Sequence, residues 1–203
     1  MENILEIKKY VVKLGGVAAI MFDRFVDHSK EQRPPEQKLY LSENNVIVLP
    51  QMNIEAFLFG ENPQGCAKAF EGKRGKEYIR MGMSHVFIDE TVIPFQDDDG
   101  NEIIFNGFDN KIFWTHEAAP RTKYGSSSIK QESRKRPVLN LPWNLHFTFR
   151  VIKNNLIDDT KLYNWLVRGG MQIALGTYRP RWGRFVVNKF EEQEKKEKVE
   201  VSK

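Results

Sequence analysis

The clearest alternation of hydrophobic and polar residues in this chain runs from Asn144 to Ile152. Successive side chains of a strand point to opposite faces of a sheet, so a period of two predicts a strand with one buried face. The hydrophobic positions are Leu145, Phe147, Phe149 and Val151, and the polar ones are His146, Thr148 and Arg150.

Shorter runs of β-branched and aromatic residues predict further strands. Residues Ile4–Phe22 predict a strand pair or one long, bent strand, with Gly15 and Gly16 at the break. Tight turns at Ser42–Asn45 and Asp97–Gly100 are expected to close two hairpins. The other expected strands are Lys38–Leu41, Val46–Leu49, Ser84–Pro94, Glu102–Phe105, Lys111–His116 and Arg184–Phe190.

Two segments change to the spacing of a helix. In the first, Asn53 is a suitable N-cap for an apolar face made of Ile54, Phe57 and Leu58, and a short second helix is expected at Gly65–Phe70. In the second, Asp158 or Asp159 caps a helix whose apolar stripe belongs to the core. That stripe consists of Leu162, Trp165, Leu166 and Ile173.

Runs of strands interrupted by two main helices predict an α+β domain with an antiparallel sheet. A ferredoxin-like βαββαβ core with two main helices and inserted loops agrees best with the order of the elements. We expect one domain over residues 1–190. The charged segment 191–203 is expected to be disordered or weakly helical.

Residues 168–189 combine five basic side chains with four glycines and contain no acidic residue. Arginine binds phosphate oxygens in a bidentate manner, aromatic rings stack on bases, and glycine lets the backbone come close to a ligand. The alternative is a glycine-rich turn whose arginines face solvent. The candidate binding residues of this segment are Arg168, Tyr178, Arg179, Arg181, Trp182 and Arg184.

A second basic segment, Glu117–Pro137, has six basic residues against two acidic ones, together with one glycine and four serines. This composition predicts a mobile loop whose cations either bind phosphate or simply face solvent. Tyr124 is a further candidate for stacking. The cations are Arg121, Lys123, Lys130, Arg134, Lys135 and Arg136.

Composition narrows the class of protein. A hydrophobic content of 40% indicates a folded domain, and a net charge of +4 favours an anionic partner. The single cysteine, Cys66, cannot form an intrachain disulfide, and no signal peptide is evident, so we expect a cytoplasmic protein. No apolar run approaches the roughly 20 residues that cross a bilayer.

Three segments, in this order along the chain, are similar to the repeat-associated RNA-binding (RAMP) superfamily of CRISPR systems. The first is VIVLPQMNIEAFLFG, a strand that leads through a proline into a helix. The second is HEAAPRTKYGSSSIKQESRKRPVLNLPWNLHFTFRV, which resembles the family's basic mid-chain segment. The third is LVRGGMQIALGTYRPRWGRFVV, which resembles its C-terminal helix, glycine-rich loop and closing strand.

The chain most resembles the backbone subunits that polymerise along guide RNA. This resemblance implies a ferredoxin-like fold, contacts to single-stranded RNA (guide or target), and a homo-oligomer or a larger ribonucleoprotein. The resemblance assigns RNA contact to four residues of the third segment and five of the second. They are Arg179, Arg181, Trp182 and Arg184, and Arg121, Lys123, Arg134, Lys135 and Arg136. Because the chain is short and its loop is bulky, a shortened relative carried by a virus or mobile element agrees with the pattern as well.

Catalytic and metal motifs are weak. The three carboxylates Asp97–Asp99 suggest a metal ion, but successive side chains diverge, and Asp-Gly favours a turn. We expect no cofactor and a non-catalytic binding protein. Two alternatives stay open: a ribonuclease that uses Asp23, Asp27 or His28, and a virus-encoded mimic that docks on a host CRISPR complex.

Overall fold

The computed structural model describes residues 4–24, 33–118 and 134–200. The segment of strict alternation forms β8 (Asn144–Ile152), and its four predicted hydrophobic residues are buried, as expected. Along one edge β8 pairs with β1, and along the other with β4 and β5, all antiparallel. The remaining strands of this main sheet are β1 (Ile4–Gly16), β3 (Val48–Pro50), β4 (Val86–Ile88), β5 (Val92–Gln96) and β9 (Phe185–Glu200).

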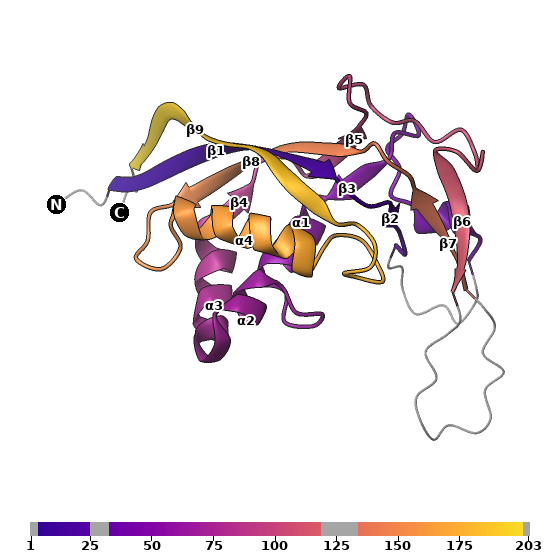
Figure 1. Cartoon of the computed structure of the whole chain (residues 1–203). Helices are drawn as coiled ribbons and strands as arrows, with labels where there is room; N and C mark the ends of the chain where they lie inside the picture. Colours follow the sequence, from indigo (N-terminus) through magenta and orange to yellow (C-terminus); the bar gives the residue numbers. More distant parts are fainter. Residues whose placement is uncertain (1–3, 25–32, 119–133, 201–203) are drawn as a thin grey trace.

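The order β9-β1-β8-β4 is that of a ferredoxin-like sheet, so the predicted α+β fold class is confirmed. Helices lie between β1 and β4 and between β8 and β9 in the chain, and they lie on the same face of the sheet (Figure 1). The helices are α1 (Gln51–Phe59), α2 (Cys66–Phe70), α3 (Gly75–His85) and α4 (Asp159–Gln172), and short 3-10 turns cover Pro35–Lys38 and Gly72–Arg74.

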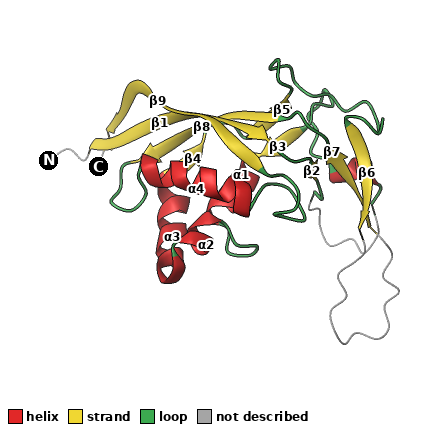
Figure 2. Cartoon of the chain, in the orientation of Figure 1, coloured by secondary structure: helices red, strands yellow, loops and turns green. Residues whose placement is uncertain are grey.

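A smaller sheet of three strands lies beside the end of the main sheet (Figure 2). Its strands are β2 (Ile20–Met21), β7 (Arg134–Leu139) and β6 (Phe113–Ala118), in that spatial order. It is continuous with the hydrophobic core, since Ile20, Phe113 and Leu139 belong to the same buried cluster as β8. This sheet is the insertion in the ferredoxin-like core that positions the candidate site.

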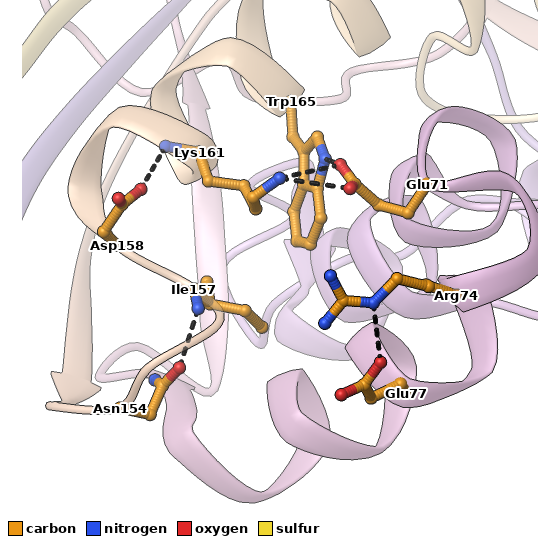
Figure 3. Close-up of polar contacts among 8 residues, drawn as sticks. All are labelled: Glu71, Arg74, Glu77, Asn154, Ile157, Asp158, Lys161 and Trp165. Carbon is orange, nitrogen blue, oxygen red and sulfur yellow. Dashed lines mark hydrogen bonds and ion pairs between the residues drawn. The ribbon is translucent and has the colours of Figure 1, made fainter.

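Helix α4 is held to α2 and α3 by one polar cluster around a buried indole (Figure 3). Glu71 accepts a hydrogen bond from Nε1 of Trp165 at 2.9 Å and from Nζ of Lys161 at 3.1 Å. The Trp165 ring packs edge-on against Phe59 and Tyr78. Asp158, one of the two predicted caps, accepts from the backbone N–H of Lys161. Leu162, Trp165, Leu166 and Ile173 are all buried, so the predicted core stripe is confirmed.

The sequence missed α3 because much of its buried face consists of glycine. Only Gly75, Tyr78 and Gly82 of this helix are buried, and Ile79 and Met81 pack partly against the core, so its apolar face contains few large residues. A Cβ at Gly82 would lie 2.1 Å from the Phe59 ring, which explains why this position is glycine. The expected strand at Ser84–Pro94 is wrong at its start, where α3 continues, and is broken between β4 and β5.

Other boundaries also differ from the predictions. Helix α1 begins directly after Pro50, so Asn53 lies inside it and does not cap it. The predicted basic loop ends at β7, which places Arg134, Lys135 and Arg136 in a strand. The predicted disordered tail is wrong up to Glu200, because β9 continues to that residue and pairs with β1. Lys8 forms an ion pair of 3.0 Å with Glu192 in this extension.

Candidate nucleic-acid interface

The glycine-rich loop, residues 174–184, connects α4 to β9 and is fixed by its backbone to the segment that leads into β2. The N–H of Gly183 donates to the carbonyl of Ala19, and that of Thr177 donates to Met21. Gly183 has φ +73, and a Cβ there would lie 2.1 Å from the carbonyl oxygen of Leu175. Glycine is therefore required at this position, where the two ends of the loop meet through Leu175 and Gly183.

The loop places Trp182 against the β6 strand of the small sheet. The indole of Trp182 is 5.8 Å from that of Trp114 and 5.4 Å from the ring of His116, between ring centroids. All three side chains are partly exposed. A group of partly exposed aromatic rings of this kind can stack on bases without regard to their identity.

Arg136 connects β7 to the same loop. Its guanidinium lies 4.9 Å from the ring centroid of Tyr178, and its Nε donates to Asp23 at 2.8 Å. Arg136 is 7% exposed, and its Nη1 is a buried nitrogen with no hydrogen-bond partner among the described residues. This arginine therefore holds Tyr178 and the loop in place, and it is not free to contact a polyanion, contrary to our prediction.

Contacts between the glycine-rich loop and the small sheet define one place, which we name the junction. It contains Trp114, His116 and Arg136 of the small sheet, and Tyr178 and Trp182 of the loop. We include Arg181, which directly precedes Trp182 and whose backbone N–H donates to the carbonyl of Tyr178. Arg181 is exposed there, and Arg184, which follows in the loop, is half-buried, with its Nε lacking a described hydrogen-bond partner. The junction combines cations with aromatic faces.

Not all predicted cations share this location. Side chains alternate along β7, so Lys135 points to the face opposite Arg136 and Trp182, and its carbonyl accepts from Nζ of the buried Lys38 at 2.6 Å. Arg134 begins β7, but its side chain is not described. The predicted residues Arg121, Lys123, Tyr124 and Lys130 lie outside the described residues.

Arg168 and Arg179 lie apart from the junction, around a cleft of about 520 Å³ between α2, α4 and the loop. The guanidinium of Arg168 is 4.2 Å from the ring centroid of Phe70. Arg179 is half-buried, and this burial lowers the pKa of its guanidinium. The predicted binding residues are therefore divided between two sites that the same loop connects.

Sequence reasoning missed Trp114, and it did not assign His116 to the site, although His116 lies close enough in the chain to reach the basic loop. The two residues are two positions apart in a predicted strand, and this spacing could have predicted that both rings lie on the same face. It also missed a basic area on the main sheet, on the face opposite the helices, where Lys13, His146 and Lys189 lie in register across β1, β8 and β9. Burial and the charge of Lys13 lower the pKa of His146.

Asp97 and Asp23, two of the residues considered for chemistry, have structural partners. Asp97 accepts hydrogen bonds from the backbone N–H groups of Asn101 and Asp99, which lower the pKa of its carboxyl and close the turn. Asp23 is paired with Arg136. Asp27 and His28 lie outside the described residues. Among the described side chains, no three His, Cys, Asp or Glu residues are grouped so that they could hold a metal ion.

Cys66 is expected to react slowly with thiol reagents in the native protein. It is fully buried, its Sγ donates to the carbonyl of Trp165 at 3.4 Å, and burial raises the pKa of its thiol, so little thiolate forms at neutral pH. Reaction with Ellman's reagent should be slow in buffer and fast in denaturant. Rapid labelling of the native protein would contradict this placement of Cys66.

Comparison with known proteins shows a likeness of fold. No protein-family model matches the chain, and no curated protein matches it. Among solved structures, a chain in the cryo-EM structure of the Type III-B Cmr-beta complex bound to cognate target RNA has a TM-score of 0.54 and 12% identity. The match covers 92% of this chain and 61% of that chain, so the present chain spans about three fifths of its neighbour's length. None of the described helices is long and apolar enough to span a bilayer.

Proposed function

We propose that this protein binds single-stranded RNA at the junction between the glycine-rich loop and the small sheet. The observation that carries the proposal is the direct contact of two segments far apart in the sequence: Trp182 packs on Trp114 and His116, and Tyr178 lies over Arg136. Arg181 supplies an exposed cation for phosphate, and Trp182 supplies a stacking face. Binding of this kind depends weakly on base sequence.

We further propose that the chain is a relative of the RAMP superfamily and acts as a subunit of a CRISPR-type ribonucleoprotein. Two observations support this proposal. The ferredoxin-like order of the main sheet is the fold expected from the resemblance, and the structural neighbour belongs to a Type III-B complex described as bound to target RNA. Repeated copies along one strand, with guide or target RNA as the ligand, are part of the same proposal.

We propose binding without cleavage. Of the three residues considered for strand cutting, Asp23 is paired with the buried Arg136, so its carboxylate serves the structure of the small sheet. Labelled single-stranded RNA incubated with the protein, with Mg²⁺ or with EDTA, should stay intact. Cutting that Asp27→Ala or His28→Ala abolishes would show instead that the protein is a ribonuclease.

Replacing Trp182 by alanine should weaken binding of a labelled oligouridine RNA by roughly fivefold to a hundredfold, because stacking of one base on an aromatic ring contributes about 1–3 kcal/mol. Fluorescence anisotropy at low salt measures the affinity. Tyr163→Ala is the matched control, since Tyr163 is an exposed aromatic residue on α4 and contacts Phe190 of β9.

Equal loss of affinity in the Trp182 and Tyr163 variants would remove the junction as the binding site. A wild-type protein that copurifies with a large complex, yet has no affinity for isolated RNA, would favour docking of the loop on a protein surface or on an existing ribonucleoprotein. In that case the proposed function is wrong.

A further inference from the structure

The cleft between α2, α4 and the glycine-rich loop has the size and charge of a small-anion site. Its volume of about 520 Å³ falls within the range of small-molecule pockets, roughly 300–1,000 Å³. Its two charged lining residues are both arginines, Arg168 and Arg179. The other residues that define its character are Gln64, Gln172, Pro63, Pro180 and Ile173.

Both arginines have free capacity for an anion. Neither forms an ion pair with any carboxylate among the residues that the structure describes. Arg168 uses the face of its guanidinium on Phe70, at 4.2 Å, which orients the group and leaves its N–H edges for a ligand. A cation that is partly removed from water gains more from an entering anion than an exposed one does, and Arg179 is such a cation.

The remaining lining favours an organic anion over a bare inorganic one. Proline and isoleucine provide apolar walls against which a flat ring can pack. The two glutamines each carry a donor and an acceptor, the groups that match the edge of a base. Phosphate, a planar ring and a polar edge are the parts of a nucleotide.

We propose that this cleft binds a nucleoside monophosphate unit, with its phosphate between Arg168 and Arg179. The unit is either a free nucleotide or the phosphorylated 5′ end of an RNA strand, which share this chemistry. The inference goes beyond the proposed function, because a mononucleotide can occupy the cleft whether or not a strand crosses the junction. Two adjacent loop residues belong to different sites: Tyr178 lies over Arg136 in the junction, and Arg179 lines the cleft.

Isothermal titration of the full chain with AMP tests the inference. Arg179→Met and Arg168→Met keep the length of the side chain and remove its charge, and each should weaken AMP binding about tenfold or more. Gln172→Glu, at an exposed position on α4, should weaken it as well, because it places a carboxylate beside the phosphate. Arg80→Met is the control: it removes an exposed arginine of α3 that lines neither the cleft nor the junction, and AMP binding should be unchanged.

Adenosine, which lacks the phosphate, should bind far more weakly than AMP. A 5′-phosphorylated RNA and its 5′-hydroxyl counterpart distinguish the two ligands. If the phosphorylated RNA binds more tightly, and Arg179→Met abolishes this difference, the ligand of the cleft is the 5′ end of a strand. If the two RNAs bind equally well, while AMP binding still depends on the arginines, the ligand is a free nucleotide.

The inference is overturned if AMP produces no binding heat, if adenosine binds as well as AMP, or if both methionine variants bind AMP as the wild type does. Its failure is distinct from failure of the proposed function. Suppose that AMP binding depends on Arg179 but RNA binding is unaffected by Trp182→Ala. The nucleotide site in the cleft is then supported, and the junction is not the RNA-binding site.

Discussion

Replacing Trp165 by alanine is expected to lower the free energy of unfolding by about 3–5 kcal/mol, as truncation of a large core aromatic does. The indole is 2% exposed, packs against Phe59 and Tyr78, and donates to Glu71 (Figure 3). Its loss leaves a cavity under α4 and removes one of the donors that satisfy Glu71. Urea denaturation followed by circular dichroism measures the change.

Tyr163→Ala is the control for that experiment. Tyr163 lies on the same helix, two positions earlier in the chain, and is 43% exposed, so its truncation should change the free energy of unfolding by about 0.5 kcal/mol or less. If the two substitutions destabilise the protein equally, α4 is not docked by the face that carries Trp165.

The second large effect is expected on RNA binding. Arg181→Glu removes an exposed cation from the junction and places a negative charge where we propose that phosphates bind. We expect the affinity for single-stranded RNA to fall by roughly tenfold to a hundredfold, since a charged hydrogen bond contributes about 1.5–3 kcal/mol. The free energy of unfolding should stay unchanged, because the side chain is exposed.

Lys135→Glu provides the matched reversal of charge. Lys135 is also exposed, but it lies on the opposite face of β7 from Arg136 and Trp182. Its variant should bind RNA nearly as the wild type does at moderate salt. Equal losses in both variants would show that affinity comes from the general positive charge of the protein and not from the junction.

The elements that carry a regular pattern were predictable. Strict alternation located β8, and spacing of three and four residues located the core stripe of α4. Helix α3 was missed because Gly75 and Gly82 form much of its buried face, and a glycine that admits a neighbouring ring leaves no hydrophobic signal. The continuation of β9 was missed because highly charged residues predict disorder, whereas here the strand continues along β1.

For the site, the sequence identified which residues to consider but not where each one points. Arg136 was predicted to bind RNA from its position in a basic run, yet its partner Asp23 lies more than a hundred residues earlier in the chain. Arg168 and Arg179 were grouped with Trp182 because they are close in sequence. Several residues of the loop around Tyr178 have positive φ angles, so the backbone turns sharply there. As a result, Tyr178 points to the junction and the neighbouring Arg179 points to the cleft.

The dependence of RNA affinity on salt tests the central claim most directly. If the junction and the basic segment next to it make six phosphate contacts, the plot of log affinity against log salt for oligouridine RNA has a slope of roughly −4. Arg181→Gln should reduce that slope by about 0.7, and Lys135→Gln should leave it unchanged. A slope near zero for the wild-type protein, or equal reductions in both variants, would contradict RNA binding at the junction.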